Sequence, residues 1–67
     1  MSLNYQYLKE RREEKKLTQL EVAEKLGYKS KTSIHYIENG KKQIPGDKLL
    51  ELANILDIDL RELSKSQ

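Results

Sequence analysis

Residues 17–40, LTQLEVAEKLGYKSKTSIHYIENG, constrain the fold most, because the residue types mark the ends of two short helices. Thr18 and Glu21 have the spacing of a capping box, in which each side chain accepts a hydrogen bond from the backbone amide of the other residue. Gly27 can end the first helix, because glycine adopts the left-handed conformation of a helix C-cap without a Cβ penalty. We therefore predict a first helix between Thr18 and Gly27.

The second half of this stretch predicts another short helix. Ser30 is the best candidate for its N-cap, and Gly40 marks its end. Ile34 and Ile37 have the helical spacing of a buried face. Two capped helices joined by a short turn describe a helix-turn-helix unit, here over about residues 18–39, whose second helix would lie in the major groove of DNA.

Four segments of this stretch, LTQ, VAEKLG, SI and IENGKK, carry a family resemblance. In order and spacing they resemble the phage-repressor (Cro/XRE-type) helix-turn-helix family of transcriptional regulators, over about residues 8–63. The resemblance implies an all-α fold, a compact five-helix repressor-like DNA-binding domain. Between Gly27 and Ile34 this chain has one residue more than the usual family pattern, so we expect a longer turn before the second helix of the unit.

The chain has 67 residues, no cysteine and one histidine. A chain of this length has room for one hydrophobic core, so we predict a single domain over residues 1–67 with its core at about 4–64. Without cysteine, and with His35 alone, no metal site is credible, and we expect no cofactor. The chain has no long apolar run and no signal-peptide core, which predicts a cytoplasmic protein without a membrane partner, nucleoid-associated when it binds DNA.

The charge is distributed unevenly, although the net charge is only +2. Residues 29–48 contain five lysines and two acidic residues, whereas residues 49–67 contain two basic and four acidic residues. The positive segment coincides with the second helix of the unit. Such an asymmetry is the electrostatic footprint that a DNA-binding face needs.

Two more helices are predicted on either side of the helix-turn-helix unit. The first helix of the chain should begin near Asn4, a good N-cap, and extend to about Lys16. The helix that follows the unit carries an apolar stripe, and Pro45 suits its first turn. Asp57 stands where relatives commonly have glycine, so a left-handed residue is expected there.

A short last helix is predicted at the C-terminal end. Asp59 and Glu62 have the spacing of a second capping box. We expect this helix to bury Leu60 or Leu63, and we expect the tail at residues 64–67 to be frayed.

The resemblance also implies roles for single residues. Arg12 stands where the family has an arginine that pairs with the glutamate of the ExG segment, here Glu38, so these two should form a structural tie between helices. Gln19 resembles the family residue that hydrogen-bonds a backbone phosphate of DNA.

Residues in and near the second helix of the unit complete the expected DNA contacts. Lys31, Thr32 and Tyr36 fall on positions that reach base edges in the family. The remaining positions are expected on phosphates or beside them, and with Gln19 they are Lys29, Ser30, Ser33, His35, Lys41 and Lys42. A structural interpretation stays open for two of these residues, since Tyr36 could be a partly buried aromatic and His35 an ordinary surface histidine.

Function is expected to need two copies of the chain, because one helix covers too few base pairs to compete against a genome of non-specific sites. We predict a homodimer on double-stranded DNA, at an operator that is an inverted repeat. The contact between copies is expected around Ile55, Ile58 and Leu60, beyond the DNA-facing half.

Two other function classes compete with operator binding. Ser30, His35 and Asp47 could be imagined as a catalytic triad, but a core this small offers no pocket that excludes water, so we expect no enzyme. The alternative to operator binding is a protein-interaction or antitoxin-type module with the same fold. The exposed apolar candidates for that role are Leu20, Leu50 and Ile55.

Overall fold

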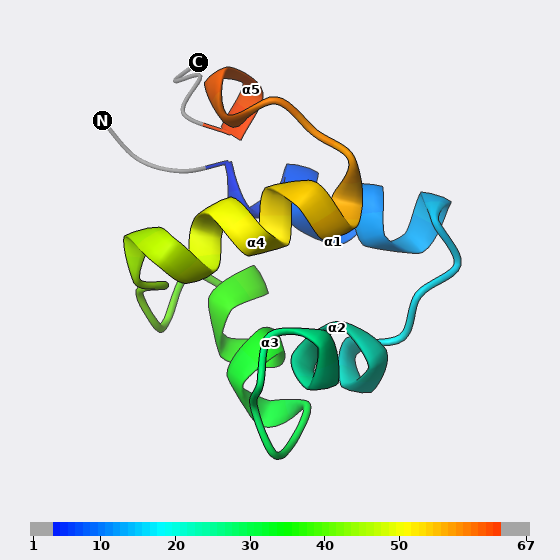
Figure 1. The fold of residues 1–67 in the computed structure, drawn as a ribbon, viewed down its shortest axis with the longest axis vertical. Coiled ribbons are helices and arrows are strands. Elements are labelled where there is room, and N and C mark those ends of the chain that lie inside the picture. The colour runs from blue at the N-terminus through cyan, green and yellow to red at the C-terminus, as the bar shows by residue number, and fades with distance from the viewer. Residues whose placement is uncertain (1–3, 64–67) are drawn as a thin grey trace.

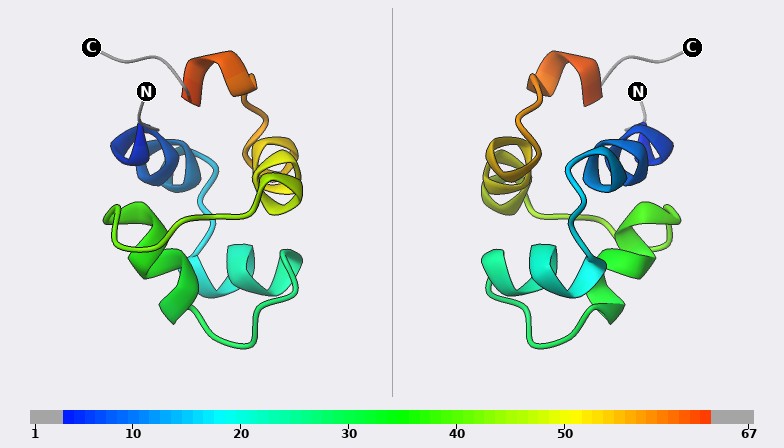
Figure 2. Two further views of the ribbon diagram at one scale, coloured as in Figure 1. Left: turned by 90° about the vertical axis from the view of Figure 1, so that its left-hand side faces the viewer. Right: turned by 90° about the vertical axis from the view of Figure 1, so that its right-hand side faces the viewer.

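The computed structural model describes residues 4–63, and five α-helices form within them. They are α1 (Tyr5–Glu14), α2 (Gln19–Lys25), α3 (Thr32–Glu38), α4 (Gly46–Leu56) and α5 (Leu60–Leu63). Helices α2 and α3 lie at one end of the molecule and α5 lies at the other, with α1 and α4 between them (Figures 1 and 2). The all-α, five-helix prediction is confirmed for this part of the chain. Residues 64–67, for which fraying is expected, lie outside the described residues.

One hydrophobic core joins α1, α2, α3 and α4. Its fully buried side chains come from all four helices, namely Leu8, Val22, Ala23, Leu26, Ile34, Ile37, Leu52 and Leu56. The apolar side chain of α5 that is described, Leu60, is half-buried and packs against this core. The side chain of Leu63, the other candidate for burial, lies outside the described part. Burial of apolar side chains from non-adjacent helices is the main force that holds such short helices, which are unstable alone.

The predicted N-caps of α1 and α2 are present. Asn4 Oδ1 accepts a hydrogen bond from the Tyr7 amide at 3.1 Å. At α2 both bonds of the capping box form: Thr18 Oγ1 accepts from the Glu21 amide at 3.0 Å, and Glu21 Oε1 accepts from the Thr18 amide at 2.8 Å. Each bond satisfies a backbone donor that has no partner within the helix.

Helix α1 ends at Glu14, two residues before the predicted end at Lys16. Lys16 has φ +59°, a left-handed conformation that cannot continue a right-handed helix. The Leu17 amide then donates to the Arg12 carbonyl at 3.1 Å. The uniformly charged run gives no local signal for this end, which explains the error.

Glycines end α2 and α3 where they were predicted to do so. Gly27 has φ +87°, and the Tyr28 amide donates to the Ala23 carbonyl at 2.9 Å, which completes a Schellman motif. Gly40 ends α3 in the same way with φ +71°. Both turns reverse the chain sharply enough for the next element to fold back on the core.

The predicted N-cap of α3 is wrong by one residue. Lys31, not Ser30, occupies the N-cap position, and its side chain makes no capping bond. Lys31 has right-handed backbone angles, φ −71° and ψ −11°, and not the extended angles that are usual at an N-cap. The Ser30 hydroxyl instead accepts a long bond of 3.4 Å from the Thr32 amide, two residues on, as in a serine turn.

The ends of α4 differ little from expectation. Pro45 is the N-cap residue and not part of the first turn. Asp57 has φ +56°, the left-handed conformation predicted for it, and the Ile58 amide donates to the Ala53 carbonyl at 3.0 Å.

Helix α5 is attached to α1 through Glu62. The Tyr7 hydroxyl donates to Glu62 Oε1 at 3.2 Å, and the pKa of Tyr7 is raised, first by desolvation and then by the charge of Glu62. The capping box at this helix is imperfect, because Asp59 Oδ1 accepts from the Arg61 amide at 2.9 Å and not from the Glu62 amide. Glu62 does reach back to the Asp59 amide, at 3.4 Å.

Candidate nucleic-acid interface

Helix α3 divides into a buried face and an exposed face. Ile34 and Ile37 are buried against the core, as their spacing predicts. Thr32 and His35 are exposed, and Tyr36 is 45% exposed. The exposed face therefore presents a hydroxyl, an imidazole and a phenol side by side on one short helix.

The candidate base-contacting residues lie around one depression with Gln19. It is lined by Gln19 from the start of α2 and by residues from the start and outer face of α3, namely Lys31, Thr32, His35 and Tyr36. The helix-turn-helix geometry thus gathers side chains that are up to 17 positions apart in sequence. The ring centroids of His35 and Tyr36 lie 5.8 Å apart.

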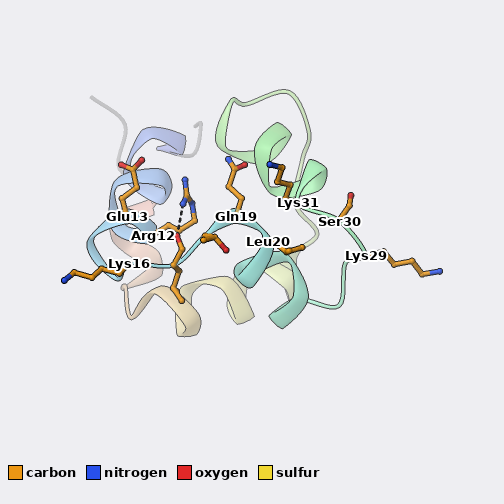
Figure 3. Close-up of a pocket in the computed structure, with 10 residues that line it drawn as sticks. Arg12, Glu13, Lys16, Gln19, Leu20, Lys29, Ser30 and Lys31 are labelled. Carbon is orange, nitrogen blue, oxygen red and sulfur yellow. Dashed lines mark hydrogen bonds between the residues drawn. The ribbon is translucent and has the colours of Figure 1, made fainter.

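A wider, open groove runs from the end of α1 past the start of α2 to the turn before α3 (Figure 3). Lys16 and Lys29 extend outward at its two ends, and Leu20 lies between them (Figure 3). Ser30 and Lys31 line it beside Lys29. Lys16 is a basic residue of this groove that sequence reasoning did not single out, because the charged run around it gives no local signal.

A buried ion pair connects α1 to the C-terminal end of α3. Arg12 Nε donates to Glu38 Oε2 at 2.6 Å, and Arg12 Nη2 donates to Glu38 Oε1 at 3.2 Å. The side chains are 10% and 5% exposed. Arg12 Nη1 also donates to the Leu17 carbonyl at 2.8 Å (dashed in Figure 3). The contact that the resemblance implies for these two residues is therefore present, and its bidentate form suits arginine and not lysine.

Gln19 joins this pair. Its Nε2 donates to Glu38 Oε1 at 3.0 Å, so Glu38 accepts bonds from two other helices. One hydrogen of the Gln19 amide is thereby occupied, and the second remains available for an acceptor outside the protein. The ion pair positions Gln19 at the edge of the depression on α3.

Two lysines, Lys41 and Lys42, follow α3. Both side chains are exposed. Lys42 Nζ donates to Ser33 Oγ at 3.2 Å and lies 5.2 Å from the centroid of the Tyr28 ring. Two residues predicted to contact phosphate, Ser33 and Lys42, therefore contact each other in the protein without DNA.

Similarity to known proteins indicates the family of this chain. A helix-turn-helix family model matches residues 8–63, most of the chain. The chain belongs to the Cro/XRE-type helix-turn-helix family. A similar solved structure is the restriction-modification controller protein C.AhdI from Aeromonas hydrophila, with 33% sequence identity and a TM-score of 0.75. The match covers 87% of this chain and 83% of that one. None of the curated proteins compared with the chain matches it.

Membership of this family makes the chain a DNA-binding transcriptional regulator. Within the residues that the structure describes, no group of three or more metal-ligating side chains comes together. The same residues include no helix long and apolar enough to cross a membrane. In this helix-turn-helix regulator, the candidate surface for DNA contact is the one around α3.

Proposed function

We propose that this regulator binds an operator sequence-specifically by placing α3 in the major groove, and that it acts as a repressor. The observation that carries the proposal is the exposed face of α3, held at one end by the buried pair of Arg12 and Glu38. A rigid helix with exposed hydrogen-bonding side chains is the element that major-groove recognition needs. Regulation is also what the name of the similar structure, a restriction-modification controller protein, describes for that protein.

The contacts divide into those that specify sequence and those that set the register. Lys31, Thr32 and Tyr36 are proposed to reach base edges. Phosphate contacts are proposed for the polar and basic residues around them, which are Gln19, Lys29, Ser30, Ser33, His35, Lys41 and Lys42. Since the exposed face of α3 has no Arg, Asn or Gln, the remaining readouts are Lys31 on guanine and Thr32 or Tyr36 on a thymine methyl group.

The functional unit is proposed to be a homodimer. Ile55, Ile58 and Leu60 are half-buried in the single chain and pack against its core. They belong to the last turn of α4, the segment after it and α5, and α5 lies at the end of the molecule opposite α2 and α3 (Figure 2). Contact there leaves both α3 helices free to enter successive major grooves, about 34–36 Å apart on one side of the duplex. The operator is then an inverted repeat with its half-site centres about one helical turn apart.

Selection of binding sites from a pool of random duplexes tests this proposal. The expected result is an inverted repeat with one preferred spacing. Insertion of five base pairs between the half-sites rotates one half-site to the opposite side of the duplex, so affinity should fall to that of a single half-site. Undiminished affinity for the spaced operator would contradict a rigid dimer, and recovery of no preferred sequence would contradict specific binding.

A salt titration separates operator binding from the protein-interaction alternative. Duplex binding through lysines weakens steeply as salt rises, because bound counterions are released from the DNA. An apolar interface around the exposed Leu20 and Leu50 should respond little to salt. A flat response, together with no retained duplex, would favour the interaction module.

A further inference from the structure

The turn between α2 and α3 is the longer turn noted in the sequence, and Tyr28 is its first residue after Gly27. The Tyr28 side chain is half-buried and packs against the hydrophobic core. Its backbone amide is bonded to Ala23, at the end of α2. Tyr28 is thus attached to α2 on one side and begins the segment that positions α3 on the other.

Two ammonium groups from later segments converge on the Tyr28 ring. Lys42, in the loop after α3, has its Nζ 5.2 Å from the ring centroid. Lys48, in the first half of α4, has its Nζ 5.8 Å from the same centroid. Both distances are within the range at which a cation is attracted to the face of an aromatic ring.

Each lysine also makes a hydrogen bond that links another element to the ring. Lys48 Nζ donates to the Leu26 carbonyl at 2.6 Å, where the C-terminal end of α2 leaves carbonyl groups without helical partners. Lys42 Nζ donates to Ser33 Oγ in the first turn of α3. The three residues therefore connect α2, α3 and α4 through one aromatic ring, and we call Tyr28, Lys42 and Lys48 the Tyr28 clamp.

The start of α3 has less local support than the start of α2. The Lys31 side chain makes no capping bond there, and the Ser30 bond to Thr32 is long. By contrast, α2 begins with a complete capping box. The orientation of the first turn of α3 thus depends on contacts from other segments.

We propose that the Tyr28 clamp sets the position of the first turn of α3, and that Lys48 is a positioning residue for sequence readout that does not touch DNA. This inference rests on the proposed function, because readout by α3 is what the clamp would support. Lys48 is half-buried, bonded to a carbonyl and 3.8 Å from Glu51, so its charge is engaged within the protein.

Replacement of Lys48 by Met removes the ammonium group and keeps much of the aliphatic stem. Hydrogen exchange of the free protein should then become about fivefold faster at the His35 amide, whose bond to the Lys31 carbonyl closes the first turn of α3. That is the size expected for loss of one cation–aromatic contact. Amides within α1 should exchange as in the wild type. Lys9→Met, at an exposed lysine on α1, removes the same charge and should leave the turn unchanged.

The same variants are then compared on the selected operator and on random duplex. Lys48→Met should lower the ratio of specific to random affinity about fivefold while the slope of affinity against salt stays as in the wild type. A salt slope flattened by about one unit would make Lys48 a phosphate ligand and overturn the positioning role. Unchanged exchange at the His35 amide would overturn the clamp itself.

Two tyrosine variants check that the ring is the shared element. Tyr28→Phe keeps the ring and should restore wild-type exchange and specificity, whereas Tyr28→Leu should behave like Lys48→Met. Equal loss in both variants would assign the effect to the hydroxyl and overturn the clamp. If the wild type selects no operator, the proposed function and the readout role both fail, and the exchange measurement still decides whether the clamp orders the turn.

Discussion

The two ends of α3 are held by different kinds of contact. At the C-terminal end, Glu38 accepts hydrogen bonds from Arg12 and Gln19 in a site that is almost closed to solvent. At the N-terminal end, the turn is held by Tyr28 with two lysines whose ammonium groups remain partly in water. One helix is therefore anchored by a buried, charged network at one end and by weaker, partly solvated contacts at the other.

This difference has a consequence for how the helix can respond to DNA. A buried ion pair is hardly screened by salt, and removal of one partner leaves an uncompensated charge, so the C-terminal end should behave as a fixed point. Exposed contacts contribute little each and are screened. Adjustment of α3 to an operator should therefore occur at its first turn, where Lys31 and Thr32 lie.

The largest effect is expected from Glu38→Gln. The Arg12 guanidinium would remain buried without its counter-charge, which should lower the free energy of unfolding by up to about 3 kcal/mol. Urea denaturation measures this change. Glu14→Gln is the matched control, because its ion pair with Arg11 is exposed and should contribute no more than about 0.5 kcal/mol. A changed base preference with no loss of stability would show that Glu38 acts on DNA and not as a tie.

Gly40→Ala should have the next largest effect, also at the C-terminal end. Gly40 has φ +71°, and a Cβ there would lie 3.2 Å from Cδ2 of the Tyr5 ring. The left-handed conformation alone costs a residue with a Cβ about 1–2 kcal/mol. Thermal unfolding should show a loss of this size or somewhat more. Gly46→Ala is the control, since it has open space around its Cβ position, and equal losses in both would disprove the steric explanation.

Lys41→Ala and Lys42→Ala should separate DNA contact from support of the first turn. Each substitution should flatten the salt slope by about one unit if the lysine contacts phosphate. Lys41→Ala should weaken specific and random duplexes alike, whereas Lys42→Ala should weaken the specific duplex more, because Lys42 also belongs to the Tyr28 clamp. Lys42→Ala should also speed hydrogen exchange at the His35 amide in the first turn of α3, because it removes the bond to Ser33 Oγ and the contact with Tyr28. Equal exchange in the two variants would argue that the Lys42 contacts do not hold the turn.

The smallest effect is expected from Ser30→Ala, at the N-terminal end. Its hydroxyl bond to the Thr32 amide is 3.4 Å long and exposed, so the free energy of unfolding should fall by less than about 0.5 kcal/mol. Thr18→Ala provides the comparison, because it breaks a complete capping box and should cost about 1 kcal/mol. A larger loss for Ser30→Ala than for Thr18→Ala would show that the first turn of α3 is capped locally after all.

Sequence reasoning succeeded for features that depend on neighbouring residues and failed where more distant contacts compete. Thr18 with Glu21, and Gly27 after them, were predicted correctly because their bonds span three to five residues. Ser30 has the right chemistry for an N-cap, yet Lys31 occupies that position and the Ser30 hydroxyl bonds to the Thr32 amide. The DNA-contacting roles remain predictions, because they depend on contacts with a duplex and not on contacts within the chain.

By itself, the sequence determined the number and kind of helices, most of their ends and the buried face of α3, because capping, glycine turns and apolar periodicity act within one or two helical turns. The pairing of Arg12 with Glu38 was expected through family resemblance, and the tertiary structure supplied its burial and its third member, Gln19. The contacts of Lys48 with Leu26 and Tyr28 were decided by the tertiary structure alone. In the sequence, a lysine on an amphipathic helix is not distinguishable from other solvated charges. Only packing brings a free carbonyl and an aromatic ring from another segment within its reach.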